Sequence, residues 1–342
     1  MSQELLTGTP LTGLVCPVTK QPLYQLDATH VTTADRQHVY EIDNGIFRLK
    51  ATEHKYKIVI PARFASTRLP GKPLLNLDDW NLINTVVYSA LQTGIDVIVA
   101  TDHEPIKESV LAFAQEQKVT ERVQVVMTDS DLVNGTERIA QAIDKLGLSD
   151  EEIIVNVQGD EPFFNPQVIN DLVAYFVASE SRNPKIKMAT IGQPQPYSEK
   201  IASPNAIKVV TDNYGLALYF SRSLLPYPRE VAPEQMTYIK HAGVYCYRAK
   251  FIREYKNLPM TPLAHVESLE QLKVLENGYQ IALMLIAGRG FVGVDTAEEL
   301  AQAQALKADY WNNHAPAGTN AKNLDQESYK RFLASFGQKY SA

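Results

Sequence analysis

Three cations follow the first strongly apolar stretch of the chain. Residues 55–75 read KYKIVIPARFASTRLPGKPLL, a short apolar run that leads into a loop carrying Arg63, Arg68 and Lys72. A glycine and several prolines restrict the loop backbone, and Ser66 adds a hydroxyl donor. Such a loop can hold a phosphate chain near its backbone while its cations neutralise the charge. The alternative is a solvated basic loop between a strand and a helix.

Two acidic turns end later apolar runs. Asp160 and Glu161 lie in NVQGDEP, and Asp295 lies in GVDTAEE. A carboxylate at the end of a buried strand is costly unless it binds a cation or caps a neighbouring segment. We therefore expect Asp160 and Asp295 to meet at one hard cation such as Mg²⁺, which prefers oxygen ligands. The alternatives are a helix cap at Asp160 and an Asx turn at Asp295.

The elements that carry these loops alternate along the first half of the chain. Short apolar runs alternate with segments of helical spacing; the runs are KIVIPA, DVIVATD, VQVVMT and EIIVNVQGD. This alternation predicts an α/β fold with a mostly parallel sheet and flanking helices, whose ligands collect at the carboxyl ends of the strands.

The second half is more mixed and predicts some antiparallel strands. The expected strands are AIKVVTD, GLALYFSR, HAGVYCYR and IALMLIAG. VESLEQLKVLENG predicts one helix that stops at Gly278, and Thr296 is expected to cap a helix over TAEELAQAQALKADYW.

Changes in the sequence pattern along the chain predict its division into domains. Residues 1–54 predict a small β-rich module, 55–311 the main domain, and 312–342 a linker with a C-terminal helix or mobile tail. The net charge of −6 argues against broad nucleic-acid binding. The apolar runs are too short for a membrane span, and the N-terminus lacks a secretory signal. We expect a cytoplasmic protein.

Eight segments, in this order, resemble the CMP-Kdo synthetases, the 3-deoxy-manno-octulosonate (Kdo) cytidylyltransferases of lipopolysaccharide precursor synthesis. They are IPARFASTRLPGKPL, NGTERIA, IVNVQGDEP, PNAIKVV, ALYFSRSLLPYPR, KHAGVYCYR, ESLEQLKVLENG and GVDTAEEL. The resemblance covers residues 57–307 and implies a nucleotide-diphospho-sugar transferase fold. It also implies transfer of CMP from CTP to an acidic 3-deoxy keto-sugar, with release of pyrophosphate, by a Mg²⁺-dependent homodimer.

The resemblance implies a role for each matching residue. Nucleotide binding falls to Arg63, Ser66, Arg68, Lys72, Gly135, Thr136 and Gln158, catalysis to Lys72, Arg63, Asp160 and Asp295, and metal binding to the two aspartates. Sugar binding falls to Gln158, Arg222, His241, Tyr245, Glu270 and Gln271, and pyrophosphate binding to Arg229. As alternatives, His241 is a core histidine, Glu270 and Gln271 form a polar helix face, and Tyr245 only packs.

Two segments depart from the family pattern. Where the family repeats GKP, this chain has Asp79 to Asn81, and where the family has QSGT it reads VNGT from Val133. The second change lies at the nucleotide base, so strict selection of cytosine does not follow from the sequence.

The first fifty residues resemble the small zinc-ribbon-like methyltransferase activators, through LVCPVTKQPL and ADRQHVYEIDNGIFRL. Only Cys16 matches a zinc ligand, since Thr19 and either Thr32 or Thr33 replace thiolates. One thiolate cannot hold structural zinc, so we expect a module without zinc that packs on the main domain or binds a protein partner.

Two other functions are consistent with the motifs. One is a cytidylyltransferase for another keto-acid sugar, such as a nonulosonic acid. The other is a degenerate homologue that binds nucleotide and regulates, against which the presence of both Asp160 and Asp295 argues.

Overall fold

A computed structural model describes residues 23–27, 30–33, 39–43, 46–48, 54–64, 69–77, 79–132, 134–286, 291 and 293–313. The chain divides into two compact units, Met1–Lys55 and Tyr56–Ala342. Each unit is described separately below.

The N-terminal unit contains an antiparallel sheet. Within its described residues, the strands pair in chain order: β1 (Leu23–Asp27), β2 (His30–Thr33), β3 (Val39–Asp43) and β4 (Ile46–Arg48). The predicted β-rich character is confirmed. Cys16 and Thr19 lie outside the described residues, and Thr32 and Thr33 lie in β2.

The first half of the second unit is the predicted parallel sheet. Its strands lie side by side in the order β10 (Ile153–Asn156), β5 (Tyr56–Ala62), β8 (Val97–Thr101) and β9 (Val123–Met127). Three helices connect these strands: α1 (Leu82–Leu91), α2 (Glu104–Glu116) and α3 (Gly135–Lys145). A fourth helix, α4 (Pro166–Arg182), follows β10. Ile58 and Ile60 join one buried apolar cluster and Val59 joins the other, so both faces of the sheet are buried.

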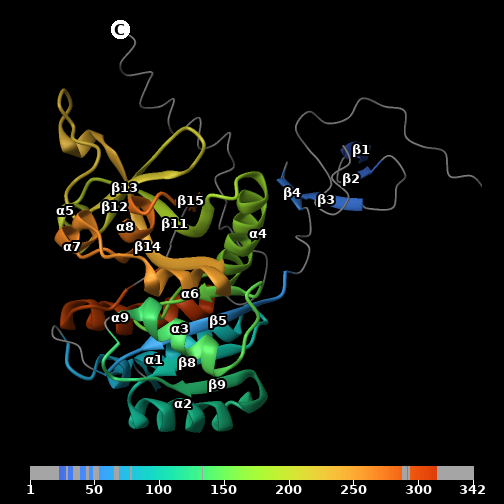
Figure 1. The fold of residues 1–342 in the computed structure, drawn as a ribbon, viewed down its shortest axis with the longest axis vertical. Helices are drawn as coiled ribbons and strands as arrows, with labels where there is room; N and C mark the ends of the chain where they lie inside the picture. Colours follow the sequence, from blue (N-terminus) through green and yellow to red (C-terminus); the bar gives the residue numbers. More distant parts are fainter. Residues whose placement is uncertain are drawn as a thin grey trace, which may run out of the picture. The chain divides into compact units, whose positions relative to one another are not determined.

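The second half extends this sheet with mostly antiparallel strands. β14 (Thr237–Arg248) runs antiparallel to β10 and also to β11 (Ile186–Pro196), which pairs in parallel with β15 (Gln280–Leu285). β12 (Lys208–Thr211) pairs with β14 at Lys240, on the opposite side of β14 from β11. β13 (Ala217–Ser221) pairs with β12. In Figure 1 this half occupies the upper part of the unit and the parallel half the lower part.

Shorter elements and the later helices complete the unit. They are η1 (Lys72–Leu74), β6 (Asn76–Leu77), β7 (Trp80–Asn81), η2 (Thr120–Arg122), α5 (Glu199–Ala202), η3 (Pro233–Gln235), α6 (Ala249–Asn257), α7 (Pro262–Glu267), α8 (Glu270–Glu276) and α9 (Ala297–Asn313). No helix in the described part of the chain is both long enough and apolar enough to span a membrane.

Strand β11 was not predicted from the sequence, because its glycine and prolines suggest a loop. A Cβ on Gly192 would lie 2.6 Å from Cγ2 of Ile239, so this glycine allows the close approach of β14. Pairing with β15 ends at Gly192, and Pro194 and Pro196 therefore lie where only β14 pairs with the strand. Proline is tolerated at such edge positions.

The helix predicted over VESLEQLKVLENG is two helices, and the single-helix prediction was wrong. Ser268 ends α7 with a left-handed φ of 51°, and α8 starts two residues later. The Glu276 carboxylate accepts hydrogen bonds from the backbone N–H groups of Leu263 and Ala264, which satisfies the start of α7. Gly278 has φ 81° just after α8, as the predicted stop requires.

Helix α9 returns to the first half of the unit. The side chain of Gln304 donates a 3.0 Å hydrogen bond to the carbonyl of Asn76 in β6. Its start is a capping box: Glu299 N–H donates to the Thr296 hydroxyl, and the Glu299 carboxylate accepts from Thr296 N–H. The predicted Thr296 cap is confirmed, and it fixes the residue before it, Asp295.

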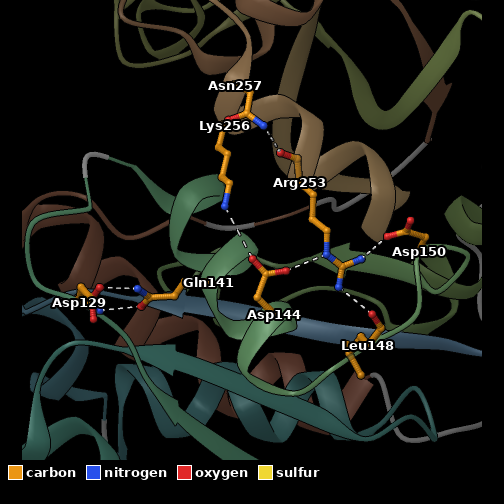
Figure 2. A network of polar contacts seen from close by, with 8 residues as sticks. All are labelled: Asp129, Gln141, Asp144, Leu148, Asp150, Arg253, Lys256 and Asn257. Atoms are coloured by element: carbon orange, nitrogen blue, oxygen red, sulfur yellow. Dashed lines mark hydrogen bonds and ion pairs between the residues drawn. The ribbon is translucent and has the colours of Figure 1, made fainter.

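Helix α3 is held at its C-terminal end by α6. Figure 2 shows Arg253 between two carboxylates, with Nε 2.7 Å from Asp144 and Nη1 2.6 Å from Asp150. Its Nη2 donates to the carbonyl of Leu148 at 2.7 Å. The opposite end of the same helix carries Gly135 and Thr136, two of the predicted nucleotide-binding residues.

Candidate functional site

The strand ends that carry the predicted loops lie at one edge of the sheet. β5 and β10 are parallel neighbours, so Arg63 after β5 and Asp160 after β10 leave the sheet on the same side. A Cβ on Gly159 would lie 2.9 Å from the carbonyl oxygen of Pro61. The glycine of QGD therefore lets the acidic turn pass against the strand that leads into the cationic loop.

Lys72 lies between the two predicted metal-binding aspartates. Its Nζ is 2.5 Å from Oδ2 of Asp160 and 2.9 Å from Oδ1 of Asp295. The Lys72 side chain is 14% exposed, and the two carboxylates are 31% and 33% exposed. Burial alone would lower the pKa of Lys72, but the two carboxylates raise it above its ordinary value.

The backbone holds the two acidic turns together. Val294 N–H donates a 2.9 Å hydrogen bond to the backbone carbonyl of Asp160. This bond joins Asp160 to the residue directly before Asp295. Asp295 N–H donates to the Glu299 carboxylate at 2.7 Å, so the capping box of α9 also fixes this turn. The predicted meeting of Asp160 and Asp295 is thus built from backbone contacts as well as from the shared lysine.

Glu161 adds a third acidic side chain beside this pair. Its Oε2 is buried without a hydrogen-bond partner in the described part of the chain. Burial, followed by the charge of Asp160, raises the pKa of Glu161 to about 8. From the sequence, Glu161 was considered beside Asp160 as a candidate for holding a hard metal ion. Its isolation from hydrogen-bond donors could not be predicted, because it depends on the fold.

The chemistry of this group fits a hard divalent cation. Mg²⁺ is commonly bound by one or two carboxylates, while water and substrate phosphates complete its shell. Asp160 and Asp295 both reach one nitrogen, so their oxygens converge on a common point. The described residues contain no cluster of three or more His, Cys, Asp or Glu that could hold a metal by itself. An ion at this pair would therefore need ligands from a substrate or from water.

The start of α3 contacts a helix from the other half of the unit. Asn134 caps α3, since its Oδ1 accepts from Glu137 N–H at 2.8 Å. The hydroxyl of Thr136 donates to Oε2 of Glu270 at 2.7 Å, and Glu270 begins α8. Burial raises the pKa of the Glu270 carboxyl group above its ordinary value, although the hydrogen bond from Thr136 lowers it in part. Predicted nucleotide-binding and sugar-binding residues are therefore in direct contact here.

Strand β14 carries two further predicted sugar-binding residues. Tyr245 pairs with Asn156 at the carboxyl end of β10, and its hydroxyl donates to Gln271 at 3.3 Å. His241 is buried, and its Nε2 lies 2.9 Å from the hydroxyl of Thr190. Burial and then Lys240 lower the pKa of His241 to about 3, so the ring is neutral at neutral pH.

The hydrogen bonds of Thr190 assign the tautomer of this histidine. The Thr190 hydroxyl donates its single proton to the carbonyl of Val244 at 2.7 Å. It therefore accepts from His241, whose proton lies on Nε2 and whose Nδ1 is left as an acceptor.

The guanidinium of Arg222 contacts backbone carbonyls. Nε donates to Glu267 at 2.7 Å, Nη1 to Pro204 at 2.9 Å and Nη2 to Ser268 at 3.3 Å. The Glu267 carboxylate in turn accepts from the Ser221 hydroxyl at 2.5 Å and from Arg222 N–H at 3.0 Å. Arg222 thus fixes the turn between α7 and α8, directly before Glu270.

The remaining predicted residues are placed as follows. Gln158 follows β10 and donates to Asn156 at 3.3 Å. Arg63 is exposed after β5, and Arg229 is exposed between β13 and β14. Ser66, Arg68 and Val133 lie outside the described residues. Thr190 and Glu267 were missed in the sequence analysis, because only the fold brings them to His241 and Arg222.

Comparisons with known proteins agree with this geometry. The model of the Cytidylyltransferase family matches residues 57–281. A 3-deoxy-manno-octulosonate cytidylyltransferase of Haemophilus influenzae is 41% identical over 263 residues, covering 74% of this chain and 98% of the relative. One of Idiomarina loihiensis is 42% identical over 262 residues, covering 74% and 99%.

Solved structures extend the comparison to the fold. A CMP:2-keto-3-deoxy-manno-octonic acid synthetase complexed with CTP is 36% identical, with a TM-score of 0.64, and the alignment covers 75% of this chain and 99% of the other. A glucose-1-phosphate thymidylyltransferase of Bacillus anthracis, 18% identical with a TM-score of 0.51, shares the fold. These matches do not support the zinc-ribbon-like resemblance of the N-terminal unit, since the family match begins at residue 57.

Proposed function

The chain belongs to the cytidylyltransferase family, and from this premise we propose that it activates Kdo, or a modified Kdo, with CTP for lipopolysaccharide synthesis. The products are the CMP-sugar and pyrophosphate. The observation that carries the proposal is the contact of Lys72 with both Asp160 and Asp295 at the carboxyl edge of the parallel strands. This edge is where ligands bind in such sheets.

The proposed reaction is an in-line transfer. The anomeric hydroxyl of the sugar attacks the α-phosphorus of CTP, its oxygen forms the new bond to phosphorus, its proton is released, and pyrophosphate leaves. Lys72 and Arg63 hold the charge that develops on pyrophosphate, with Ser66 and Arg68 on the same loop and Arg229 as a further cation. The chain's part in this chemistry is positioning and charge stabilisation.

Asp160 and Asp295 are the residues that would hold Mg²⁺. When bound, the ion would neutralise phosphate oxygens and orient the α-phosphate. The fit rests on two convergent carboxylates with no third ligating side chain among the described residues, since Mg²⁺ in such sites takes its other ligands from phosphate and water.

The sugar site is proposed on the other half of the unit. Gln158, Arg222, His241, Tyr245, Glu270 and Gln271 form its proposed lining. Neutral His241 offers Nδ1 as an acceptor for a sugar hydroxyl, and Glu270 offers a carboxylate oxygen. Gly135 and Thr136 at the start of α3 are proposed to contact the nucleotide.

Localisation, assembly and the N-terminal module complete the proposal. We propose a cytoplasmic homodimer, and exposed Leu218 on β13 and Val266 on α7 supply apolar surface that a second copy could cover. For residues 1–54 we propose a module without zinc that binds a protein partner, because Cys16 is the only thiol in that segment.

The test is pyrophosphate release from each of the four nucleoside triphosphates with Kdo, its 8-amino analogue and a nonulosonic acid. We expect release from CTP with Kdo or the amino analogue, and only when Mg²⁺ is present. Preferential release with the nonulosonic acid would support a cytidylyltransferase for another keto-acid sugar. Binding of CTP without release for any sugar would support the regulatory homologue instead.

A further inference from the structure

One ammonium group satisfies two carboxylates at the centre of the site. Lys72 Nζ donates hydrogen bonds to the carboxylates of Asp160 and Asp295, which come from distant parts of the sequence. Two carboxylates this close repel each other, so a cation between them stabilises the pair. Here that cation is the Lys72 side chain of the chain itself.

The carboxylates that hold Lys72 are the same ones that fit a divalent ion. An ion shared by Asp160 and Asp295 would need the oxygens on which the ammonium donates its hydrogen bonds. The lysine and the ion therefore compete for these oxygens, because both charges cannot occupy one point between two carboxylates.

The geometry allows the Lys72 ammonium group to move away from the two carboxylates. It starts a single 3₁₀ turn after Gly71, whose φ of 67° is left-handed, and its long flexible stem can aim the ammonium in more than one direction. The side chains of Asp160 and Asp295 are each about one-third exposed, so solvent reaches this ion pair. Arg63, directly after β5, is a second cation that a phosphate chain could bind, and the phosphate would offer Lys72 a new partner.

We propose that Lys72 is a built-in counter-cation that keeps divalent ions off the acidic pair until an anionic nucleotide draws the lysine away. Nucleotide and metal then bind cooperatively, since each favours the position of Lys72 that the other needs. This inference rests on the proposed function and adds a role for Lys72 before the chemistry begins.

The test measures Mn²⁺ binding to the nucleotide-free protein by electron paramagnetic resonance. Lys72→Met removes the competitor, and we expect it to bind Mn²⁺ about tenfold or more tightly than the wild type, as loss of a charge-assisted hydrogen bond implies. Lys72→Arg keeps a cation that can bridge both carboxylates, and it should bind Mn²⁺ no more tightly than the wild type. Lys145→Met, on the surface of α3, is the control and should change nothing.

Two further readouts protect the test against misfolding. Mn²⁺ should raise the melting temperature of Lys72→Met more than that of the wild type, and Asp295→Asn in the Lys72→Met background should cancel the gain. Equal or weaker Mn²⁺ binding by folded Lys72→Met, or tighter binding by Lys72→Arg, overturns the inference. If Lys72→Met does not fold, the Lys72→Arg result decides.

The outcomes separate this inference from the proposed function. Normal CMP-sugar formation by the wild type, with unchanged Mn²⁺ affinity in Lys72→Met, overturns only the counter-cation. Tighter Mn²⁺ binding in Lys72→Met, with no CMP-sugar formed by the wild type, supports the counter-cation and overturns the proposed function.

Discussion

The two halves of the catalytic unit build their parts of the site from different interactions. In the parallel half, Lys72, Asp160 and Asp295 are charged, partly exposed and paired with one another. In the antiparallel half, His241 is neutral and buried, and Arg222 donates its guanidinium hydrogen bonds to backbone carbonyls. The first group can exchange its partners for a ligand, whereas the second is already fixed by the fold.

This difference suggests that the two halves bind different chemical groups of the substrates. Charges that are paired with one another can be moved by a triphosphate and a divalent ion, which bring charges of their own. Polar groups held by the backbone keep their positions when a ligand arrives, and such preorganisation suits the recognition of a neutral pattern of hydroxyls. The predictions below test whether each half behaves in this way, from the largest expected effect to the smallest.

Removing one carboxylate of the acidic pair should have the largest effect. Asp160→Asn and Asp295→Asn should each lower kcat for Mg²⁺-dependent pyrophosphate release by about 10³-fold or more, because the charge that holds the ion and Lys72 is halved. The measurement is a coupled pyrophosphate assay with CTP and Kdo. Asp129→Asn, on an exposed carboxylate that contacts Gln141, is the matched control and should retain activity. Near-normal turnover in either site variant would remove the metal assignment.

The neutral histidine should appear in the pH dependence of stability. The pKa of His241 falls from 6.5 to about 3 on folding, so between these values the unfolded chain binds a proton that the folded protein excludes. Its contribution to stability is therefore complete above pH 6.5 and is lost by about 1 kcal/mol per pH unit as the pH falls towards 3.

Urea unfolding at pH 7 and at pH 5 checks this sign. His241→Asn should lose less stability than the wild type between the two pH values, whatever its stability at pH 7. An equal loss in both proteins would mean that His241 is protonated in the folded state.

The contact between the halves should couple the two substrates. Thr136→Val removes the donor and Glu270→Leu removes the acceptor of the 2.7 Å hydrogen bond between α3 and α8. We expect each to raise KM for CTP and for the sugar, with a coupling energy of about 1 kcal/mol in the double-mutant cycle. Strictly additive effects on both KM values would show that the bond does not link the two sites.

The smallest effect is expected away from the site. Arg253→Ala removes the surface clamp on α3 drawn in Figure 2 and should lower the free energy of unfolding by about 1 kcal/mol or less. KM for CTP should stay unchanged, since the start of α3 is held separately by Asn134 and Glu270. A large rise in KM would mean that the position of Thr136 depends on the far end of its helix.

The sequence predicted one half better than the other, for a physical reason. Periodicity revealed β5, β8, β9 and β10 with their helices, and strand-end chemistry selected Lys72, Asp160 and Asp295, because local patterns determine parallel strands and their loops. β11 was missed because Gly192 is required by close packing against β14, which no local pattern reveals.

Features in both halves also depend on long-range contacts that the sequence does not specify. The break at Ser268 is fixed by the carbonyls that Arg222 binds, and the buried oxygen of Glu161 is isolated only once β10 and the turn at Gly293 are in place. The family resemblance predicted a sugar-binding role for Arg222, but its contacts with the turn between α7 and α8 required the fold.

The most direct test is mass spectrometry of the products that the wild-type protein forms from CTP and Kdo with Mg²⁺. Our account predicts CMP-Kdo and pyrophosphate in equal amounts, and neither product when Asp295 is replaced by Asn. Intact CTP after incubation with the wild type, or CMP that is not joined to the sugar, would contradict it.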